Sequence, residues 1–130
     1  MFLLVASLHT HCSAPPEGRF EYPDTDRVEL RLSAADVHAT IEGSRFFKNR
    51  ESMIMVKILD KNFSPVQNTQ VECFMHNKGR RHTAESVDQL EPGIFKILLK
   101  PTWTGNGTII LTVAGKDAEA IFKLKVTVNE

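Results

Sequence analysis

Short runs of alternating apolar and polar residues dominate this chain from residue 28 to its end. Each run is followed by turn-forming residues such as Gly, Pro, Asn or Asp, and the runs recur about every 8 to 12 residues. No stretch shows the period of an amphipathic helix. The eight runs cover residues 28–32, 37–41, 52–59, 70–76, 83–87, 94–99, 108–114 and 120–128. This pattern predicts an all-β fold, an immunoglobulin-like (Ig-like) antiparallel β-sandwich of about seven to eight strands.

The segment at residues 90–115 carries the strongest of these signals. Two runs rich in β-branched residues, 94–99 and 108–114, are joined by a link that contains Pro101, Trp103 and a Gly-rich turn. We expect these runs to form a hairpin of two antiparallel core strands. Trp103 lies between strands rather than on one, so the Cys, Trp and Cys arrangement of antibody domains is absent. Further turns are expected at residues 77–79 and 91–93, each of which ends in Gly.

The composition limits the partners that the chain is expected to bind. Its 130 residues suit a single domain, and its 16 Lys and Arg residues are balanced by 16 Asp and Glu residues. Without a net charge there is no electrostatic reason to expect binding to nucleic acid. No CxxC pair marks a zinc or dithiol site, and no Ser, His and Asp set or Gly-rich phosphate loop marks an active site. The sequence therefore predicts a protein that is not an enzyme and has no cofactor, with copper as the one exception.

The N-terminus differs in composition from the rest of the chain. Residues 1–8 are continuously apolar but too short to span a bilayer, which is typical of a signal peptide. We expect residues 1–14 to be a signal or lipoprotein leader, with Cys12 either a lipid anchor or the end of the removed leader. A first strand or a disordered end is the alternative. Residues 15–26 contain three Pro residues and are expected to be an extended tether. The domain at residues 27–130 would then lie outside the cytoplasm, in the periplasm or cell envelope, and would touch a membrane only through the leader or anchor.

The order of turn motifs from residue 52 to residue 128 resembles that of two Ig-like families. A strand that ends at Asp60 is followed by Pro65, a Met-containing strand at residues 71–75, the turn at Gly93 and a Gly-rich hairpin at residues 104–107. This order resembles the bacterial FixH and YtkA-like envelope domains, and the filamin-type repeat has a similar order. We favour the first family because a leader, a thiol and a Pro-rich segment precede one lone domain, whereas filamin repeats occur in arrays.

The FixH and YtkA resemblance implies a role in copper handling or oxidase assembly. The matching residues here are Met75, His76 and His82, which carry thioether and imidazole groups that bind Cu(I). Alternation within residues 70–76 favours a different role, because Cys73 and Met75 share the inward face while His76 points outward. Cys73 and Met75 are then expected to pack in the core, with Cys73 a free thiol. The two arginines beside this loop also raise the cost of binding a cation.

Two classes of function remain. Arg80 and Arg81 follow a hairpin turn and offer positive charge to an acidic partner. An interaction module would bind another envelope protein through such a loop or through an exposed strand edge. A copper-handling accessory protein would instead bring its soft side chains together at a metal ion. We expect the first class, a non-catalytic Ig-like binding module, because Ig-like sandwiches serve binding more often than chemistry.

Overall fold

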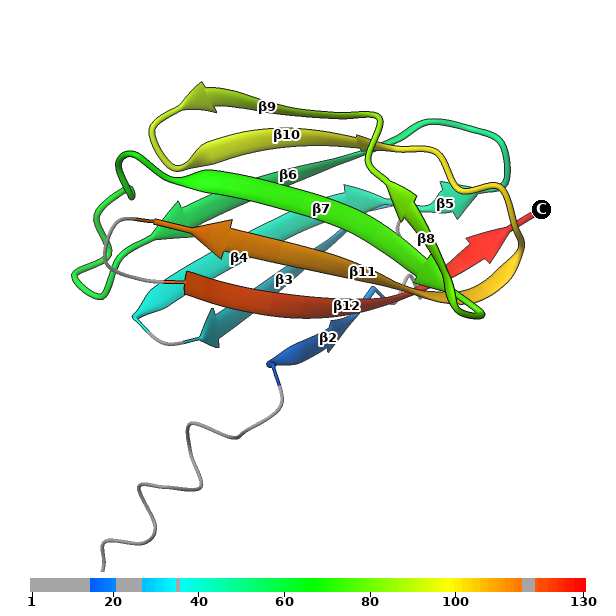
Figure 1. Ribbon diagram of the computed structural model, residues 1–130, viewed down its shortest axis with the longest axis horizontal. Coiled ribbons are helices and arrows are strands. Elements are labelled where there is room, and N and C mark those ends of the chain that lie inside the picture. The colour runs from blue at the N-terminus through cyan, green and yellow to red at the C-terminus, as the bar shows by residue number, and fades with distance from the viewer. Residues whose placement is uncertain (1–14, 21–26, 35, 116–118) are drawn as a thin grey trace, which may run out of the picture.

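The computed structural model describes residues 15–20, 27–34, 36–115 and 119–130 (Figure 1). Residues 1–14, the predicted leader with Cys12, lie outside the described residues, as do residues 21–26. Every regular element in the described part is a β-strand, and it contains no helix that could cross a membrane. The strands are β2 (Glu17–Arg19), β3 (Arg27–Ala34), β4 (Val37–Ser44), β5 (Phe46–Phe47), β6 (Ser52–Leu59), β7 (Gln70–Asn77), β8 (Arg80–Thr83), β9 (Ser86–Glu91), β10 (Ile94–Leu99), β11 (Gly105–Ala114) and β12 (Glu119–Asn129).

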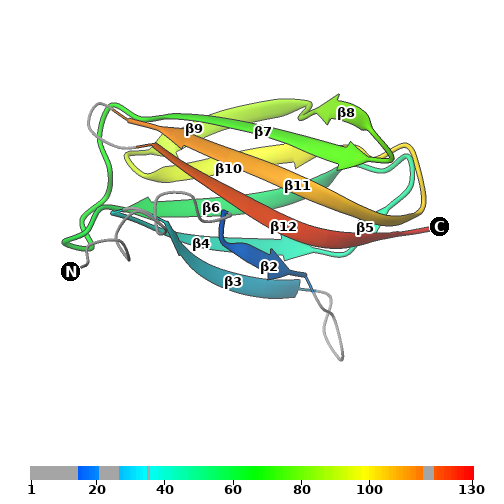
Figure 2. The same ribbon diagram turned by 60° about the horizontal axis from the view of Figure 1, so that its bottom comes forward.

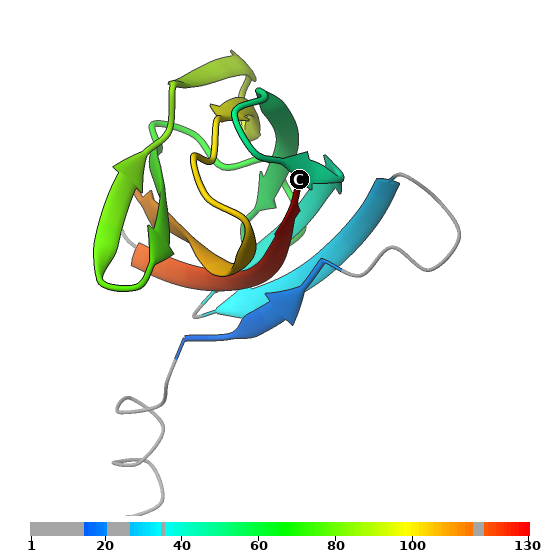
Figure 3. The same cartoon turned by 90° about the vertical axis from the view of Figure 1, so that its right-hand side faces the viewer.

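The strands form two sheets that enclose one core (Figure 3). One sheet has the order β3-β4-β6-β10-β9. The other has the order β2-β12-β11-β7-β8, with β5 also paired to β12. The orders β4-β6-β10-β9 and β7-β11-β12 reproduce the ABED and CFG sheets of an Ig domain. The chain is therefore an Ig-like antiparallel β-sandwich, as its sequence predicts, and β2 and β3 precede the first Ig strand.

Inward side chains of both sheets fill the core. Ile97, Leu111 and Phe122 come from three different strands and are fully buried. Buried residues alternate with more exposed ones along β4, β6, β7 and β12, which confirms the faces assigned from the sequence. β6 lies at the centre of its sheet, as its apolar sequence predicts.

β10 and β11 do not form the hairpin that their sequences predict. β10 pairs with β6 and β9, whereas β11 pairs with β12 and β7 in the opposite sheet. The link between them carries the chain across the core, and Pro101 within this link is buried. The hairpin prediction is wrong because alternation records only which side chains face the core. A hairpin within one sheet and a link between two sheets give the same alternation.

The weak strand expected at residues 83–87 is the junction of two strands in different sheets. β8 pairs with β7, and β9 pairs with β10. Between them, the Ala84 N–H donates to the Cys73 carbonyl oxygen (3.1 Å) and the Glu85 N–H donates to the Leu98 carbonyl oxygen (2.8 Å). These two bonds satisfy the backbone where the chain crosses from one sheet to the other.

Two of the predicted turns adopt left-handed backbone conformations. Lys78 and Gly79, between β7 and β8, have φ angles of 49° and 79°, and Gly93, between β9 and β10, has a φ of 79°. A Cβ atom on Gly93 would lie 2.7 Å from the Ile58 carbonyl oxygen. Glycine is therefore required at Gly93 for both its conformation and its close approach to β6.

Residues 17–20, part of the segment expected to be a tether, join the fold instead. Glu17–Arg19 forms β2, which runs parallel to β12 (Figure 2). Phe20 is buried, and its ring packs edge-on against the Phe46 ring with centroids 5.8 Å apart. The tether prediction is wrong for residues 17–20 because Phe20 supplies apolar surface to the core and Gly18 lets β2 approach β3 closely.

Candidate functional site

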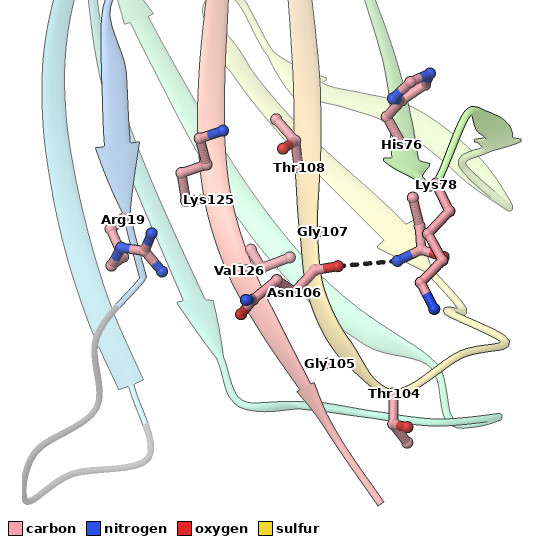
Figure 4. Close-up of a pocket in the computed structure, with 11 residues that line it drawn as sticks. Arg19, His76, Lys78, Thr104, Gly105, Asn106, Gly107, Thr108, Lys125 and Val126 are labelled. Carbon is pink, nitrogen blue, oxygen red and sulfur yellow. Dashed lines mark hydrogen bonds between the residues drawn. The ribbon is translucent and has the colours of Figure 1, made fainter.

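Five side chains from five neighbouring strands line up on the outer face of the β2-β12-β11-β7-β8 sheet. Arg19 is paired with Lys125, Lys125 with Thr108, Thr108 with His76, and His76 with Arg81. Directly paired residues of neighbouring strands point to the same face, with Cβ atoms about 4.5 to 5.5 Å apart. We call these five residues the basic row, and Figure 4 shows four of its members.

The basic row borders a depression of about 620 Å³ at one end of the same sheet (Figure 4). The side-chain N–H of Asn77 donates to the Asn106 carbonyl oxygen over 2.9 Å, and the Thr127 hydroxyl donates to Oδ1 of Asn106 over 3.3 Å. These bonds tie β7, β11 and β12 together at this end of the sheet. The depression therefore has a fixed polar wall, and Lys78 from the β7–β8 turn also lines it.

The lining of the depression carries positive charge and no carboxylate. Arg19, Lys78 and Lys125 all line it, and none of them forms an ion pair with another described residue. Like charges on directly paired residues repel, so Arg19 beside Lys125 costs stability unless an anion lies near both. The site is suited to an anionic group.

The two arginines expected to meet an acidic partner lie on different faces of β8. Arg81 belongs to the basic row, and its guanidinium carbon lies 3.9 Å from the centre of the Phe74 ring. This cation–π contact holds Arg81 along the outer face of the sheet. Arg80 is exposed at the hairpin tip, opposite Asn77 and on the other face of the strand. The structure thus places Arg81 in the candidate site and leaves Arg80 outside the row.

The three residues that the copper hypothesis needs are not brought together. Met75 is buried in the core and lies directly opposite His82, whose ring packs on that of Trp103 with centroids 4.9 Å apart. His76 lies on the outer face, directly opposite Arg81. Two of the three residues therefore share the inner side of the β7–β8 ladder, and the sheet separates the third from them. Within the described ranges, no three His, Cys, Asp or Glu side chains are grouped as metal ligands would be.

Cys73 is a buried thiol, as its place on an alternating strand predicts. The other cysteine of the chain, Cys12, lies outside the described residues. Burial raises the pKa of the Cys73 thiol from 9.0 to about 12, because a thiolate in the core would lose its hydration. The thiol is therefore protonated at neutral pH. Neither nucleophilic attack nor metal binding through a thiolate is available to it in this environment.

The sequence carries no signal that the members of the basic row are neighbours. Arg19 and Lys125 lie near opposite ends of the chain, and only strand register makes them neighbours. A local signal exists for Lys125, which stands at an outward position of an alternating run. No such signal exists for Arg19, because residues 15–26 have the composition of a tether.

No protein-family model matches the sequence, and no curated protein sequence matches it. Solved structures do match the fold. A DUF4426 family protein from Pseudomonas aeruginosa PAO1 aligns with a TM-score of 0.59 and 13% identity, over 78% of this chain and 94% of that protein. A DUF4785 family protein from Legionella pneumophila subsp. pneumophila str. Philadelphia 1 aligns with a TM-score of 0.54 and 10% identity, over 73% of this chain and 29% of that protein.

The Lin-41 filamin domain aligns with a TM-score of 0.44 and 18% identity, over 66% of this chain and 90% of that domain. At these identities the likeness to the two bacterial proteins shows a shared fold alone. The relationship to FixH and YtkA-like domains that the turn motifs suggest stays a prediction.

Proposed function

We propose that this protein is a non-catalytic binding module of the cell envelope, whose basic row binds an acidic region of another envelope protein. The row is the observation that carries the proposal. Its cations lie on one sheet face without an acidic partner among the described residues. An acidic segment lying across the strands would meet Arg19, Lys125 and Arg81 in turn, along about 19 Å or four strand spacings.

The chemistry of the site supports binding rather than catalysis. Thr108 and His76 are directly paired, so a hydroxyl and an imidazole are neighbours. A nucleophile activated in this way needs a third group that accepts a hydrogen bond from the imidazole and orients it. The residue on the other side of His76 is Arg81, which has donors and no acceptor. No carboxylate lines the depression that could serve as this third group.

The envelope location rests on the N-terminal sequence. Residues 1–8 form an apolar stretch of the length found in signal peptides. In this proposal the protein contacts a membrane only through its leader or through a lipid on Cys12. Nucleic acid is not the proposed partner, because the charges of the whole chain balance.

Site-specific photo-crosslinking in the native host tests the proposal. A photoreactive amino acid at Thr108 lies in the centre of the basic row, and one at Lys57 lies on the outer face of the opposite sheet. We expect a discrete crosslinked protein from Thr108 only. The charge reversal Arg19→Glu with Lys125→Glu should abolish that crosslink, because like charges then face the acidic partner.

The matched control for this reversal is Lys57→Glu with Lys96→Glu. Both lysines lie on the outer face of the opposite sheet, so the control makes the same change of net charge away from the row. A crosslink that survives the reversal of Arg19 and Lys125 would show that the row is not the binding surface. Equal loss with the control would show that only the overall charge matters.

Copper handling is the second candidate function, and one observation favours it. Met75 and His82 are directly opposite each other in the β7–β8 ladder, so a thioether and an imidazole share one side of the hairpin. These groups suit Cu(I). The resemblance to FixH and YtkA-like domains supports the same function. A Cu(I) titration with single replacements of His76 and His82 tests it.

A further inference from the structure

Among the described strands, β3 is the longest of the four that lie at the ends of the two sheet orders. β2, β8 and β9 have 3, 4 and 6 residues, whereas β3 has 8. One side of β3 pairs with β4, and no strand in the described part of the chain pairs with its other side. Figure 2 shows β3 along the lower border of the sandwich. An edge of this length offers a row of backbone N–H and C=O groups to another strand.

The side chains of β3 alternate between apolar residues on the core side and charged residues on the outer face. Val28, Leu30 and Leu32 pack against the core but are only partly buried. On the outer face, Nε of Arg31 donates to Oε1 of Glu29 over 3.1 Å, with 81% of the Arg31 side chain and 43% of the Glu29 side chain exposed. β3 thus combines incomplete apolar burial with two accessible opposite charges.

We propose that two copies of this chain associate through β3, paired antiparallel about a two-fold axis at Leu30. In this register Glu29 of each copy lies opposite Arg31 of the other on the outer face, and Val28 lies opposite Leu32 on the core side. The 5-stranded sheets of the two copies then form one continuous sheet. Each copy contributes the same residues, so the interface is closed by symmetry.

Among alignments centred on Glu29, Leu30 or Arg31, the charges of β3 favour the one at Leu30. Directly paired residues of the two copies point to the same face. An axis that passes between two residues would pair an apolar residue with a charged one and so place apolar side chains on the outer face. The two-fold axis must therefore pass through a residue. Centring on Glu29 would bring two Glu29 side chains together, and centring on Arg31 would bring two Arg31 side chains together. Of these three alignments, only the one at Leu30 pairs opposite charges, and it does so twice.

A second copy suits β3 better than it suits β8 or β2. β8 carries Arg80 and Arg81, whose like charges would oppose pairing with an identical strand, and β2 is too short to support a ladder. A second copy supplies the complementary charges of β3 by symmetry alone. The small area of a single strand pair predicts a weak dimer that forms with increasing concentration.

Sedimentation velocity of the full chain at concentrations up to about 0.5 mM tests the proposal. We expect a monomer–dimer equilibrium for the wild-type chain. Glu29→Arg places like positive charges across the axis, and Arg31→Glu places like negative charges there. Each variant alone should therefore dimerise at least about tenfold more weakly than the wild-type chain.

Mixing the two variants provides the matched control. In a mixed pair, positions 29 and 31 again carry opposite charges at both contacts, so the 1:1 mixture should dimerise about as well as the wild-type chain. The double exchange Glu29→Arg with Arg31→Glu should also dimerise. Lys57→Glu, on the outer face of a central strand, should leave the equilibrium unchanged.

Three results would overturn the proposal. The wild-type chain could stay monomeric over the whole range, or the mixture could associate no more than its components do. A dimer unaffected by either single replacement would place the contact elsewhere, for example at the apolar residues 1–8. Glu29 and Arg31 are exposed, and circular dichroism of each variant checks that its fold is retained.

Discussion

The imidazole ring of His82 packs against the indole ring of Trp103, with the ring centroids 4.9 Å apart. His82 reaches this position because β8 pairs with β7 so that His82 lies opposite the buried Met75. His76 lies on the other face of the same hairpin, in the basic row. A metal ion bound by both histidines would therefore require the hairpin to lose its strand pairing.

Titration with Cu(I) under anaerobic conditions separates copper handling from plain partner binding. We expect weak binding that neither His82→Ala nor His76→Ala changes, because Met75 is held in the core. Copper handling predicts tight binding that His82→Ala abolishes and His76→Ala retains, since only His82 shares a side with Met75. The two replacements are matched, because each removes one imidazole from an opposite face of one hairpin.

Truncation of Phe122 measures how much the core of the sandwich contributes to stability. Phe122 is fully buried in β12, so Phe122→Ala should lower the free energy of unfolding by about 3–5 kcal/mol through lost burial and an unfilled cavity. The neighbouring Ile121 is 39% exposed, and Ile121→Ala should cost less than about 1 kcal/mol. Chemical denaturation of both variants gives the two values. Similar losses would contradict the assignment of inner and outer faces in β12.

Gly79 and Gly93 form a matched pair because both have a φ of 79°. A Cβ atom at Gly79 would meet nothing within 4 Å, whereas one at Gly93 would lie 2.7 Å from the Ile58 carbonyl oxygen. Gly79→Ala should cost about 1–2 kcal/mol from its left-handed backbone alone. Gly93→Ala should cost at least about 1 kcal/mol more, because the Ile58 carbonyl must move.

The hydrogen bond from the Ile58 N–H to the Gly93 carbonyl oxygen, at 2.7 Å, makes that movement harder, because it ties the turn to β6. Chemical denaturation of the two alanine variants measures the difference. Equal losses of stability would mean that the β9–β10 turn relaxes without disturbing β6.

Burial could be predicted from the sequence, whereas strand partners could not. Alternation assigns Phe122 and Leu124 to the core because successive side chains of a strand point to opposite faces. The same alternation does not reveal that Ile97 and Leu111 belong to different sheets, since side chains from either sheet face one core. Pairing depends on how far each link carries the chain, and this is not a local property of the strands.

The candidate site could be predicted only in part for the same reason. Arg81 is recognisable from its place after a hairpin turn, which is a local signal. Arg19 and Lys125 become neighbours only through the parallel pairing of β2 with β12. A strand of 3 residues, such as β2, carries too little alternation to be recognised.

Alkylation kinetics test the buried environment of Cys73. In a Cys12→Ser background, which leaves one thiol, Cys73 should react slowly with iodoacetamide in the native protein at about pH 8 and rapidly after denaturation. The reason is that the core excludes the reagent and keeps the thiol protonated. Rapid modification of the native protein would show that β7 is accessible at this position.

The raised pKa of Cys73 predicts how the free energy of unfolding depends on pH. Burial raises the pKa of Cys73 from 9.0 to about 12, so between these values the unfolded chain has lost a proton that the folded chain keeps. Because the folded state then binds more protons, the free energy of unfolding must fall as the pH rises. The contribution of the neutral thiol to the free energy of unfolding is complete below pH 9 and is lost progressively toward pH 12.

Denaturation curves measured over this pH range test the prediction. We expect the free energy of unfolding to fall more steeply for the wild-type chain than for Cys73→Ala, in which every other titrating group is retained. Parallel curves for the two proteins would mean that Cys73 ionises as readily in the folded chain as in the unfolded chain.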